Sequence, residues 1–251
     1  MYSLLVPLGA RERNYFCHKT IRLHSSTFPM SWFINVFRNS LGRKLLMATT
    51  GLFLISFLIV HCAVNAAIFY NDNGRIFTIA AHFMATNPII RTIEIILVLA
   101  FVAHIFQGFW LWRLNRDARP VRYAYKDDSS SSWYSRSMTL FGTLILLFLV
   151  IHTSNFWIPN RVNQFLYGEE LPLYEMMLEK FHNPLEVCIY LAGCFSLFWH
   201  LLHGFKSAFQ TMGWVHRKYS ALISMSGIIF SVLSSTVLAA MPVAIYFDWI
   251  A

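Results

Sequence analysis

Charged residues are scarce in this chain. Asp, Glu, Lys and Arg make up 13% of its 251 residues, whereas they make up about a quarter of an ordinary soluble domain. Hydrophobic residues account for 57%. A soluble fold needs more charged surface than this, so the composition indicates an integral membrane protein.

Cysteine is also scarce, and none of it stands at a metal-binding spacing. The four cysteines are Cys17, Cys62, Cys188 and Cys194, and no CxxC motif is present. Three of them lie in apolar runs, where cysteine acts as a small packing residue, so no disulfide framework is expected. The net charge of +8 does not indicate nucleic-acid binding, because the basic residues sit mainly in short segments between apolar runs.

Five stretches are long enough to span a bilayer, which takes about 20 mostly apolar residues. They run near Leu45 to Tyr70, Thr92 to Leu114, Met138 to Ile158, Pro184 to Phe209 and Tyr219 to Phe247. The sequence therefore predicts an all-α integral membrane bundle of five transmembrane helices, formed by residues 30–251. Residues 1–29 lack a spanning run and a signal-peptide core, and we expect them to be a poorly ordered N-terminal extension.

Charge in the connecting segments predicts the orientation. One side carries most of the basic residues, namely Arg38, Arg43, Lys44, Arg113, Arg116, Arg119, Arg122, Lys126, Arg136, Lys206, Arg217 and Lys218. On the other side basic residues are diluted by Glu169, Glu170, Glu175 and Glu179. The positive-inside rule then places the N-terminus in the cytoplasm and the C-terminus outside. The acidic connection from Asn160 to Asn183 is expected outside, with a short amphipathic helix at Leu173–Phe181.

Histidines are the main chemical signal, because ionisable residues inside a bilayer are costly and usually functional. His61, His104, His152 and His200 stand on four different predicted spans. One lone histidine is as often a packing residue bonded to a carbonyl. Four of them on four spans are better explained as axial ligands of haem iron, which neutral imidazole binds well.

An internal repeat selects the pairs. MATTGLFLISFLIVH, ending at His61, resembles MTLFGTLILLFLVIH, ending at His152, and HIFQGFWLW from His104 resembles HLLHGFKSAF from His200. The offsets are 91 (152 − 61) and 96 (200 − 104), as expected of two duplicated hairpins followed by a fifth helix. We predict one haem between His61 and His152, toward the outside, and one between His104 and His200, toward the cytoplasm, with roughly 10 Å between their depths.

Two glycines and a fifth histidine accompany these residues. Gly108 and Gly204 follow His104 and His200 by four residues on the same helix face. They either leave room for a flat macrocycle or let helices pack closely. His203 competes with His200 as a ligand, but the repeat register favours His200.

With these residues, the chain from about Ser31 to Ala251 resembles the membrane cytochrome b subunit of bacterial succinate dehydrogenases and fumarate reductases, the five-helix dihaem type. The four histidines and the stretch HLLHGFKSAFQTMGW, His200 to Trp214, carry the resemblance. In that family the first and third histidine-bearing helices hold the outer haem, which matches the pairing from the repeat. Some fumarate reductases of this type have a glutamate two residues before the fourth ligand. This chain has Phe198 there, so the proton pathway linked to that glutamate is not implied.

The resemblance implies a multi-pass protein of the bacterial cytoplasmic (inner) membrane with two haem b groups. It implies two cytoplasmic partners, an iron–sulfur subunit and a flavoprotein subunit that performs the succinate or fumarate chemistry, which this chain itself does not. The basic segment Arg113–Arg136 is either their docking rim or only a topology signal. Menaquinone is the implied substrate near the outer haem, where the candidates for proton exchange are His82, Arg91 and Glu94. An Arg91–Glu94 ion pair is the simpler interpretation of the last two.

The sequence leaves two other functions open. One is the dihaem cytochrome b subunit of a hydrogenase or formate dehydrogenase, for which a different histidine layout is expected. The other is a transporter or scaffold without a cofactor, in which the histidines form a proton relay. A reduced-minus-oxidised absorption spectrum separates this last function from the haem proteins.

Overall fold

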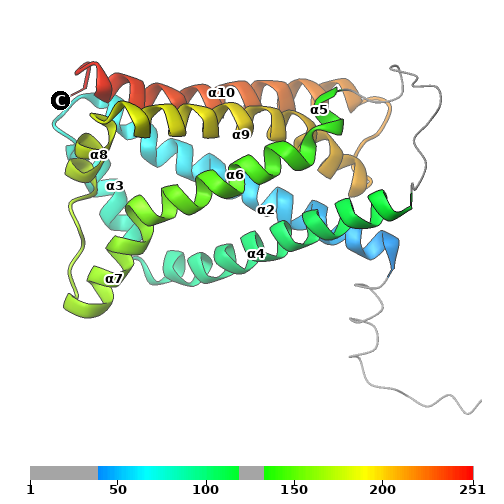
Figure 1. Cartoon of the computed structure of the whole chain (residues 1–251), viewed down its shortest axis with the longest axis horizontal. Coiled ribbons are helices and arrows are strands. Elements are labelled where there is room, and N and C mark those ends of the chain that lie inside the picture. The colour runs from blue at the N-terminus through cyan, green and yellow to red at the C-terminus, as the bar shows by residue number, and fades with distance from the viewer. Residues whose placement is uncertain (1–38, 119–132, 251) are drawn as a thin grey trace, which may run out of the picture.

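The chain folds into a bundle of long helices (Figure 1). This computed structural model describes residues 39–118 and 133–250, and in those residues all regular structure is helical. Five of the helices are long and apolar enough to cross a membrane. The predicted all-α, multi-pass membrane fold is therefore confirmed at this level, while the N-terminal extension expected at residues 1–29 lies outside the described residues.

Each predicted span corresponds to one of these long helices. They are α2 (Ser40–Ala66) with the 3-10 turn η1 (Ala67–Tyr70), α4 (Pro88–Asp117), α6 (Met138–His152) with the π-helix η2 (Thr153–Trp157) and α7 (Ile158–Tyr167), α9 (Pro184–Thr211), and α10 (Ser220–Tyr246). The third span was predicted to end at Ile158, and this is wrong, because the helix continues to Tyr167. The residues after Ile158 include Asn160, Arg161, Asn163 and Gln164, but they still form the last helical turns.

Two Asn-Pro pairs set the starts of α4 and α9. The side chain of Asn87 accepts hydrogen bonds from the backbone N–H groups of Ile89 and Ile90, and that of Asn183 accepts one from Leu185. A proline follows each asparagine at the first helical position, where its fixed φ and missing N–H cost nothing. Local sequence alone thus fixes where these two spans begin.

Three short helices flank the spans: α3 (Arg75–Thr86), α5 (Trp133–Arg136) and α8 (Leu173–Phe181). The amphipathic helix predicted at Leu173–Phe181 is confirmed as α8. No helix was predicted where α3 lies. A tight turn leads into α3 at Gly74, which has φ 72°, and a Cβ there would lie 2.3 Å from the ring of Tyr174 in α8. Glycine therefore allows α3 and α8 to pack closely at this end of the bundle.

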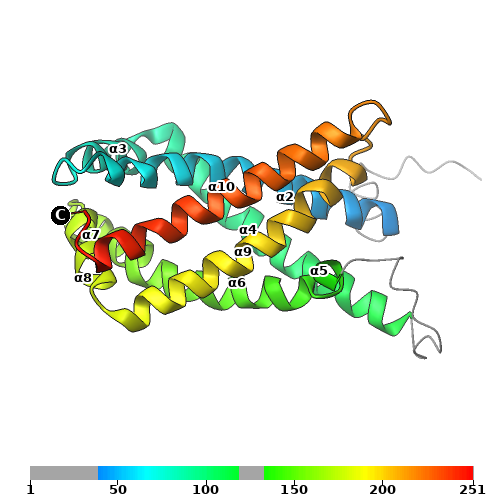
Figure 2. The ribbon, with the colours of Figure 1, turned by 90° about the horizontal axis from the view of Figure 1, so that it is seen from above.

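The four helices that carry the predicted ligands pack around a common centre. Helix α2 packs against α4 and α9, and α6 packs against α9 and α4, while α10 covers α9 and α2 from outside this group. Figure 2 shows the same arrangement from above. The side chains of α2, α4, α6 and α9 can therefore meet in the centre of the bundle.

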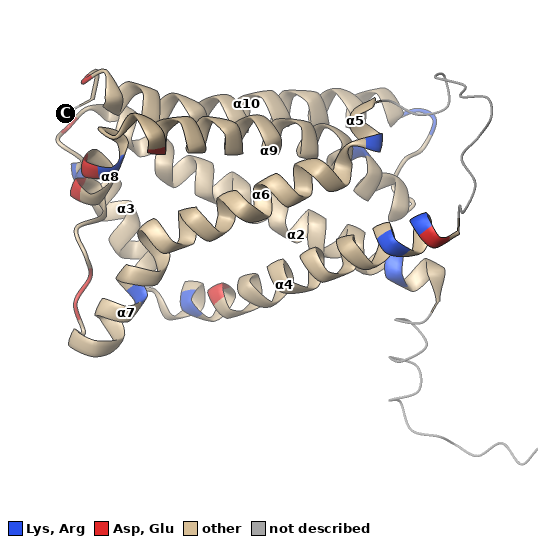
Figure 3. Cartoon of the chain, viewed as in Figure 1, with Lys and Arg blue, Asp and Glu red and all other residues tan. Residues whose placement is uncertain are grey.

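Charge is distributed unevenly between the two ends of the bundle (Figure 3). Lys and Arg gather where α2 begins and α4 ends, which we call the basic end. Most acidic residues lie at the opposite end, around α8, which we call the α8 end. Residues 119–132, which include three of the basic residues of the predicted docking rim, lie outside the described part of the chain.

Candidate functional site

Four histidine rings meet as two pairs inside the bundle. The ring centroids of His61 in α2 and His152 in α6 are 5.8 Å apart, and those of His104 in α4 and His200 in α9 are 6.2 Å apart. These are the pairs that the sequence repeat assigned. We call His61 and His152 the outer pair, nearer the α8 end, and His104 and His200 the inner pair. His203 packs instead against the ring of Tyr134, at 6.3 Å.

Two glycines mark the level of the inner pair. A Cβ added to Gly51 of α2 would lie 3.4 Å from Cε1 of His104, and one on Gly142 of α6 would lie 3.6 Å from Cε1 of His200. Each glycine precedes the outer-pair histidine of its own helix by ten residues (61 − 51 and 152 − 142). Ten residues of helix rise about 15 Å. The path along α2 between the levels of the two pairs is thus about 15 Å, of the same order as the roughly 10 Å predicted between their depths.

Gly108 and Gly204, the glycines that the sequence offered for macrocycle room, have different neighbours. A Cβ on Gly108 would lie 3.7 Å from the methyl carbon of Met47, and one on Gly204 would lie 3.5 Å from that of Met138. Both are ordinary contact distances to the ends of flexible side chains. The described residues thus give these glycines helix-packing contacts, and the glycines that face histidine rings are Gly51 and Gly142 instead.

Aromatic rings hold the outer pair in place. Phe57 stacks on His61 at 5.4 Å, and Phe148 stacks on His152 at 5.6 Å, each from one helical turn before its histidine. The ring of Tyr190 in α9 meets the ring of His152 edge-on at 5.8 Å. Such contacts restrict the rotamers of both histidines.

Hydrogen bonding distinguishes the four imidazoles. Nδ1 of His104 lies 3.2 Å from the hydroxyl of Thr50. The amide nitrogen of Asn65 lies 3.4 Å from Nδ1 of His61 while it donates to the His61 carbonyl at 2.8 Å. Nδ1 of His152 and Nδ1 of His200 are buried and have no hydrogen-bond partner among the described residues. In each pair, therefore, Nδ1 of one imidazole lies near a polar side chain, and Nδ1 of the other has no partner among the described residues.

The four histidines form pairs, and a pair of histidines can hold only a metal centre that needs two ligands from the protein. In the described ranges, no group of three or more His, Cys, Asp or Glu side chains is placed to hold a metal ion. A bare zinc-type ion needs three or four protein ligands. A haem iron would need only two ligands from the protein, and each pair would supply two histidines. The arrangement suits haem better than a bare metal ion.

The candidates for proton exchange lie at the α8 end. Glu94 accepts hydrogen bonds from Arg91 at 2.9 Å, from Nε of Arg161 at 2.7 Å and from the indole of Trp157 at 2.6 Å. The predicted Arg91–Glu94 ion pair is present. His82 lies apart from this group, with Nδ1 3.1 Å from a carboxylate oxygen of Glu170. Glu94 is thus held by Arg91 of its own helix and by Arg161, which connects α4 with α7.

Sequence reasoning missed a polar group beside the outer pair. Asn155 donates to the carboxylate of Glu186 at 3.0 Å and to the hydroxyl of Tyr190 at 3.3 Å. Asn155 lies in the π-helix η2, which begins directly after His152. Pro159 follows, and a proline inside a helix clashes with the carbonyl four residues before it, here that of Asn155. Pro159 in the sequence was the available signal, since such π-turns are frequent at functional sites.

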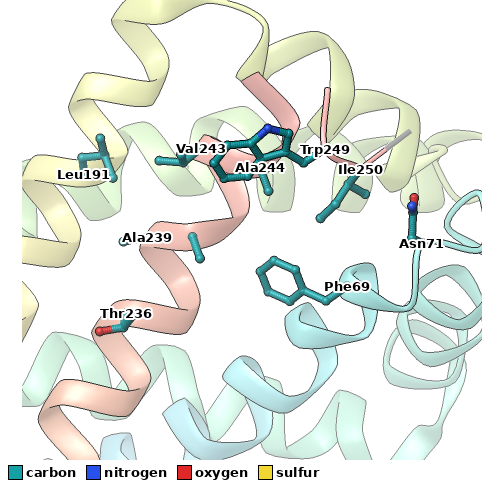
Figure 4. Close-up of a pocket in the computed structure, with 10 residues that line it drawn as sticks. Phe69, Asn71, Leu191, Thr236, Ala239, Val243, Ala244, Trp249 and Ile250 are labelled. Carbon is teal, nitrogen blue, oxygen red and sulfur yellow. The ribbon is translucent and has the colours of Figure 1, made fainter. Parts of the chain in front are cut away.

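An apolar groove opens near the same end, between the end of α2 and α10 (Figure 4). It has a volume of about 610 Å³ and is lined by Phe69, Asn71, Leu191, Thr236, Ala239, Ala240, Val243, Ala244, Trp249 and Ile250. None of these ten side chains is charged. The groove therefore offers apolar contacts but no acid or base for proton exchange.

Comparison with known proteins adds no relative. The chain matches no protein-family model, no curated protein and no solved structure.

Proposed function

We propose that this chain is the membrane cytochrome b subunit of a succinate:quinone oxidoreductase and passes electrons between an iron–sulfur subunit and menaquinone. The observation that carries the proposal is the meeting of four intramembrane histidines as two pairs, 5.8 and 6.2 Å apart between ring centroids. The fold class, the pairing and the family resemblance of the sequence all favour the same function.

The separations within the pairs fit haem iron. A metal–imidazole bond is about 2 Å long, and the ring centroid lies about 1 Å beyond the bonded nitrogen. Two histidines that held one iron between them would therefore have ring centroids about 6 Å apart. The values of 5.8 and 6.2 Å bracket this distance.

One buried polar group between the inner pair and the start of α2 also suits haem. Nε of Arg43 in α2 is buried and has no partner among the residues that the structure describes. A haem carries two propionates, and a guanidinium is a strong donor for a carboxylate. When bound, the two haems supply one-electron redox chemistry, and the chain holds them through His61 with His152 and through His104 with His200.

Equivalent contacts support the proposed duplication. Gly51 faces His104 as Gly142 faces His200, and Phe57 stacks on His61 as Phe148 stacks on His152. The glycine and phenylalanine offsets are both 91 (142 − 51 and 148 − 57), equal to that of the outer-pair histidines. Two repeated hairpins followed by a fifth helix explain why the glycines, the phenylalanines and the outer-pair histidines share one offset.

The two ends of the bundle have different tasks in this proposal. The basic end faces the bacterial cytoplasm and receives the iron–sulfur subunit, with the flavoprotein subunit beyond it. Menaquinone reacts near the outer pair, where its reduction to menaquinol takes two electrons and two protons. Glu186 joins His82, Arg91 and Glu94 as a candidate for proton exchange, because Asn155 links its carboxylate to Tyr190 beside His152.

Purification of the intact complex tests the proposal. We expect a reduced-minus-oxidised spectrum with b-type bands, two haems per chain, a flavin and an iron–sulfur partner, and succinate-dependent quinone reduction. Absence of b-type absorption would remove every haem function and favour a cofactor-free transporter or scaffold. Two haems with a nickel or molybdenum enzyme as partner would identify a hydrogenase or formate dehydrogenase subunit instead.

A further inference from the structure

We infer that Thr50 is a positioning residue for His104, which fixes the imidazole with its proton on Nδ1 and Nε2 free to bind iron. The inference rests on the proposed haem-binding function. It concerns a side chain of α2 that meets the histidine of α4 across the helix interface, 54 residues away in sequence.

The hydrogen bonds of the Thr50 hydroxyl set its direction. The hydroxyl oxygen lies 2.8 Å from the carbonyl oxygen of Leu46 and 3.1 Å from that of Met47. Carbonyl oxygens only accept, so the hydroxyl proton is directed to one of them. The hydroxyl oxygen is then the acceptor for His104, whose Nδ1 lies 3.2 Å away.

This direction determines the tautomer of the imidazole. A neutral imidazole has one N–H donor and one acceptor nitrogen. With the proton on Nδ1 and shared with Thr50, Nε2 carries the lone pair that binds a metal. Gly51 lies beside the same ring, and a Cβ added to it would lie 3.4 Å from Cε1 of His104. Thr50 and Gly51 thus set both the tautomer and the room for the ring.

The other ligand of the inner pair lacks such a partner. The offset of 91 between the hairpins places Phe141 at the position equivalent to Thr50 (141 − 50). Phenylalanine cannot accept a hydrogen bond from a ring N–H in this way, and Nδ1 of His200 has no partner among the described residues. The Thr50 bond therefore occurs in the first repeat and not in the second. Because His104 belongs to the inner pair, the bond acts on the inner haem.

The bond predicts a direction for the redox potential. Hydrogen bonding to the second ring nitrogen raises the basicity of a ligating histidine. A more basic ligand favours ferric over ferrous iron, so the bond lowers the reduction potential of the inner haem. Removing it should make that haem easier to reduce and leave the outer haem unchanged.

Potentiometric titration of the purified holo-complex tests this with three variants. Thr50→Val keeps the shape of the side chain and removes the hydroxyl acceptor, whereas Thr50→Ser keeps the hydroxyl acceptor. Thr49→Val is the matched control, because the exposed Thr49 bonds the same Leu46 carbonyl but no histidine. At the midpoint potential of the wild type, we expect Thr50→Val to raise the ferrous-to-ferric ratio of the inner haem about threefold. This corresponds to a rise of about 30 mV in its midpoint potential. Thr50→Ser and Thr49→Val should match the wild type.

The outcomes separate the inference from the function on which it rests. A wild-type chain without haem would overturn the proposed function. If the wild type carries two haems, and Thr50→Val keeps both at unchanged potentials, the positioning role is wrong. It is equally wrong if Thr49→Val shifts the potential as much as Thr50→Val. If Thr50→Val loses haem, Thr50→Ser decides, since it must retain both haems at wild-type potentials.

Discussion

The outer and inner histidine pairs have different surroundings. Beside the outer pair lies a hydrogen-bonded group of Asn155, Glu186 and Tyr190, with a carboxylate that can exchange protons. The inner pair has the Thr50 hydroxyl beside His104 and one glycine beside each of its two rings. The difference fits a division of tasks in which electrons alone pass the inner pair, and electrons meet protons at the outer pair.

The difference is local, because the two pairs are built alike. Each joins histidines from two helices with almost the same centroid separation, 5.8 and 6.2 Å. The divergence comes from the π-helix after His152 and from Thr50 on α2. If the proposed duplication is right, these two local differences make two similar histidine pairs unequal.

Removing one ligand from each pair gives the largest expected effect. We predict that His200→Ala loses the inner haem and keeps the outer one, and that His152→Ala does the reverse, because a five-coordinate haem between these helices lacks one of its two protein bonds. Haem quantification and reduced spectra measure this. His203→Ala is the control and should retain two haems. If His203→Ala loses a haem while His200→Ala loses none, His203 is the ligand.

A substitution that displaces a neighbouring ring tests the outer pair without touching a ligand. A Cβ on Gly193 would lie 2.6 Å from the ring of Phe148, which stacks on His152. Gly193→Ala should destabilise the complex by about 1–3 kcal/mol and alter the spectrum of the outer haem more than that of the inner one. Thermal unfolding and difference spectra measure both effects.

Gly204→Ala is the matched control for this substitution, because its Cβ would meet only the methyl end of Met138, at 3.5 Å. It should cost less stability than Gly193→Ala. Equal losses in the two variants would show that general helix packing, rather than the Phe148–His152 stack, is what Gly193→Ala disturbs.

Neutralising the carboxylate near the outer pair tests the division of tasks. Glu186→Gln should slow menaquinone reduction at least about tenfold, since a positioned acid or base contributes this much or more, while both haems remain bound. The measurement is succinate–quinone turnover compared with reduction of an artificial acceptor at the iron–sulfur subunit. Glu179→Gln, an exposed glutamate of α8, is the control. Unchanged quinone turnover in Glu186→Gln would assign proton exchange to another group.

The sequence predicted those features that depend on local composition or on the repeat. Apolar length predicted the spans, amphipathic spacing predicted α8, and repeat register paired His61 with His152 and His104 with His200. In each case the signal lies within a few helical turns or in a comparison of two similar segments.

Features that depend on how helices face one another were not predictable in this way. The partners of Glu94 include Arg161, 67 residues away, and the His104 ring meets Thr50 and Gly51 of another helix. Such contacts require the rotation and axial shift of each helix, which hydrophobic length does not give. The level of the inner pair on α2 was not predictable for the same reason, since only the helix contacts show that Gly51 lies beside His104.

The smallest predicted effect is a pH dependence confined to the α8 end. Nε2 of His182, after α8, lies 3.0 Å from the carboxylate of Asp248, after α10. The Leu178 carbonyl and the Asp248 carboxylate raise the pKa of His182 above its usual value, near 6.5. A raised pKa means that the contact stabilises the fold fully below the unfolded pKa and that this contribution is lost as pH rises through the folded pKa.

Melting temperatures at about pH 6 and about pH 8 should therefore differ slightly more in the wild type than in His182→Gln. Because the contact is exposed and distant from the inner pair, the spectrum of the inner haem should not follow this titration. An equal pH dependence in both proteins would show that the contact contributes nothing to stability.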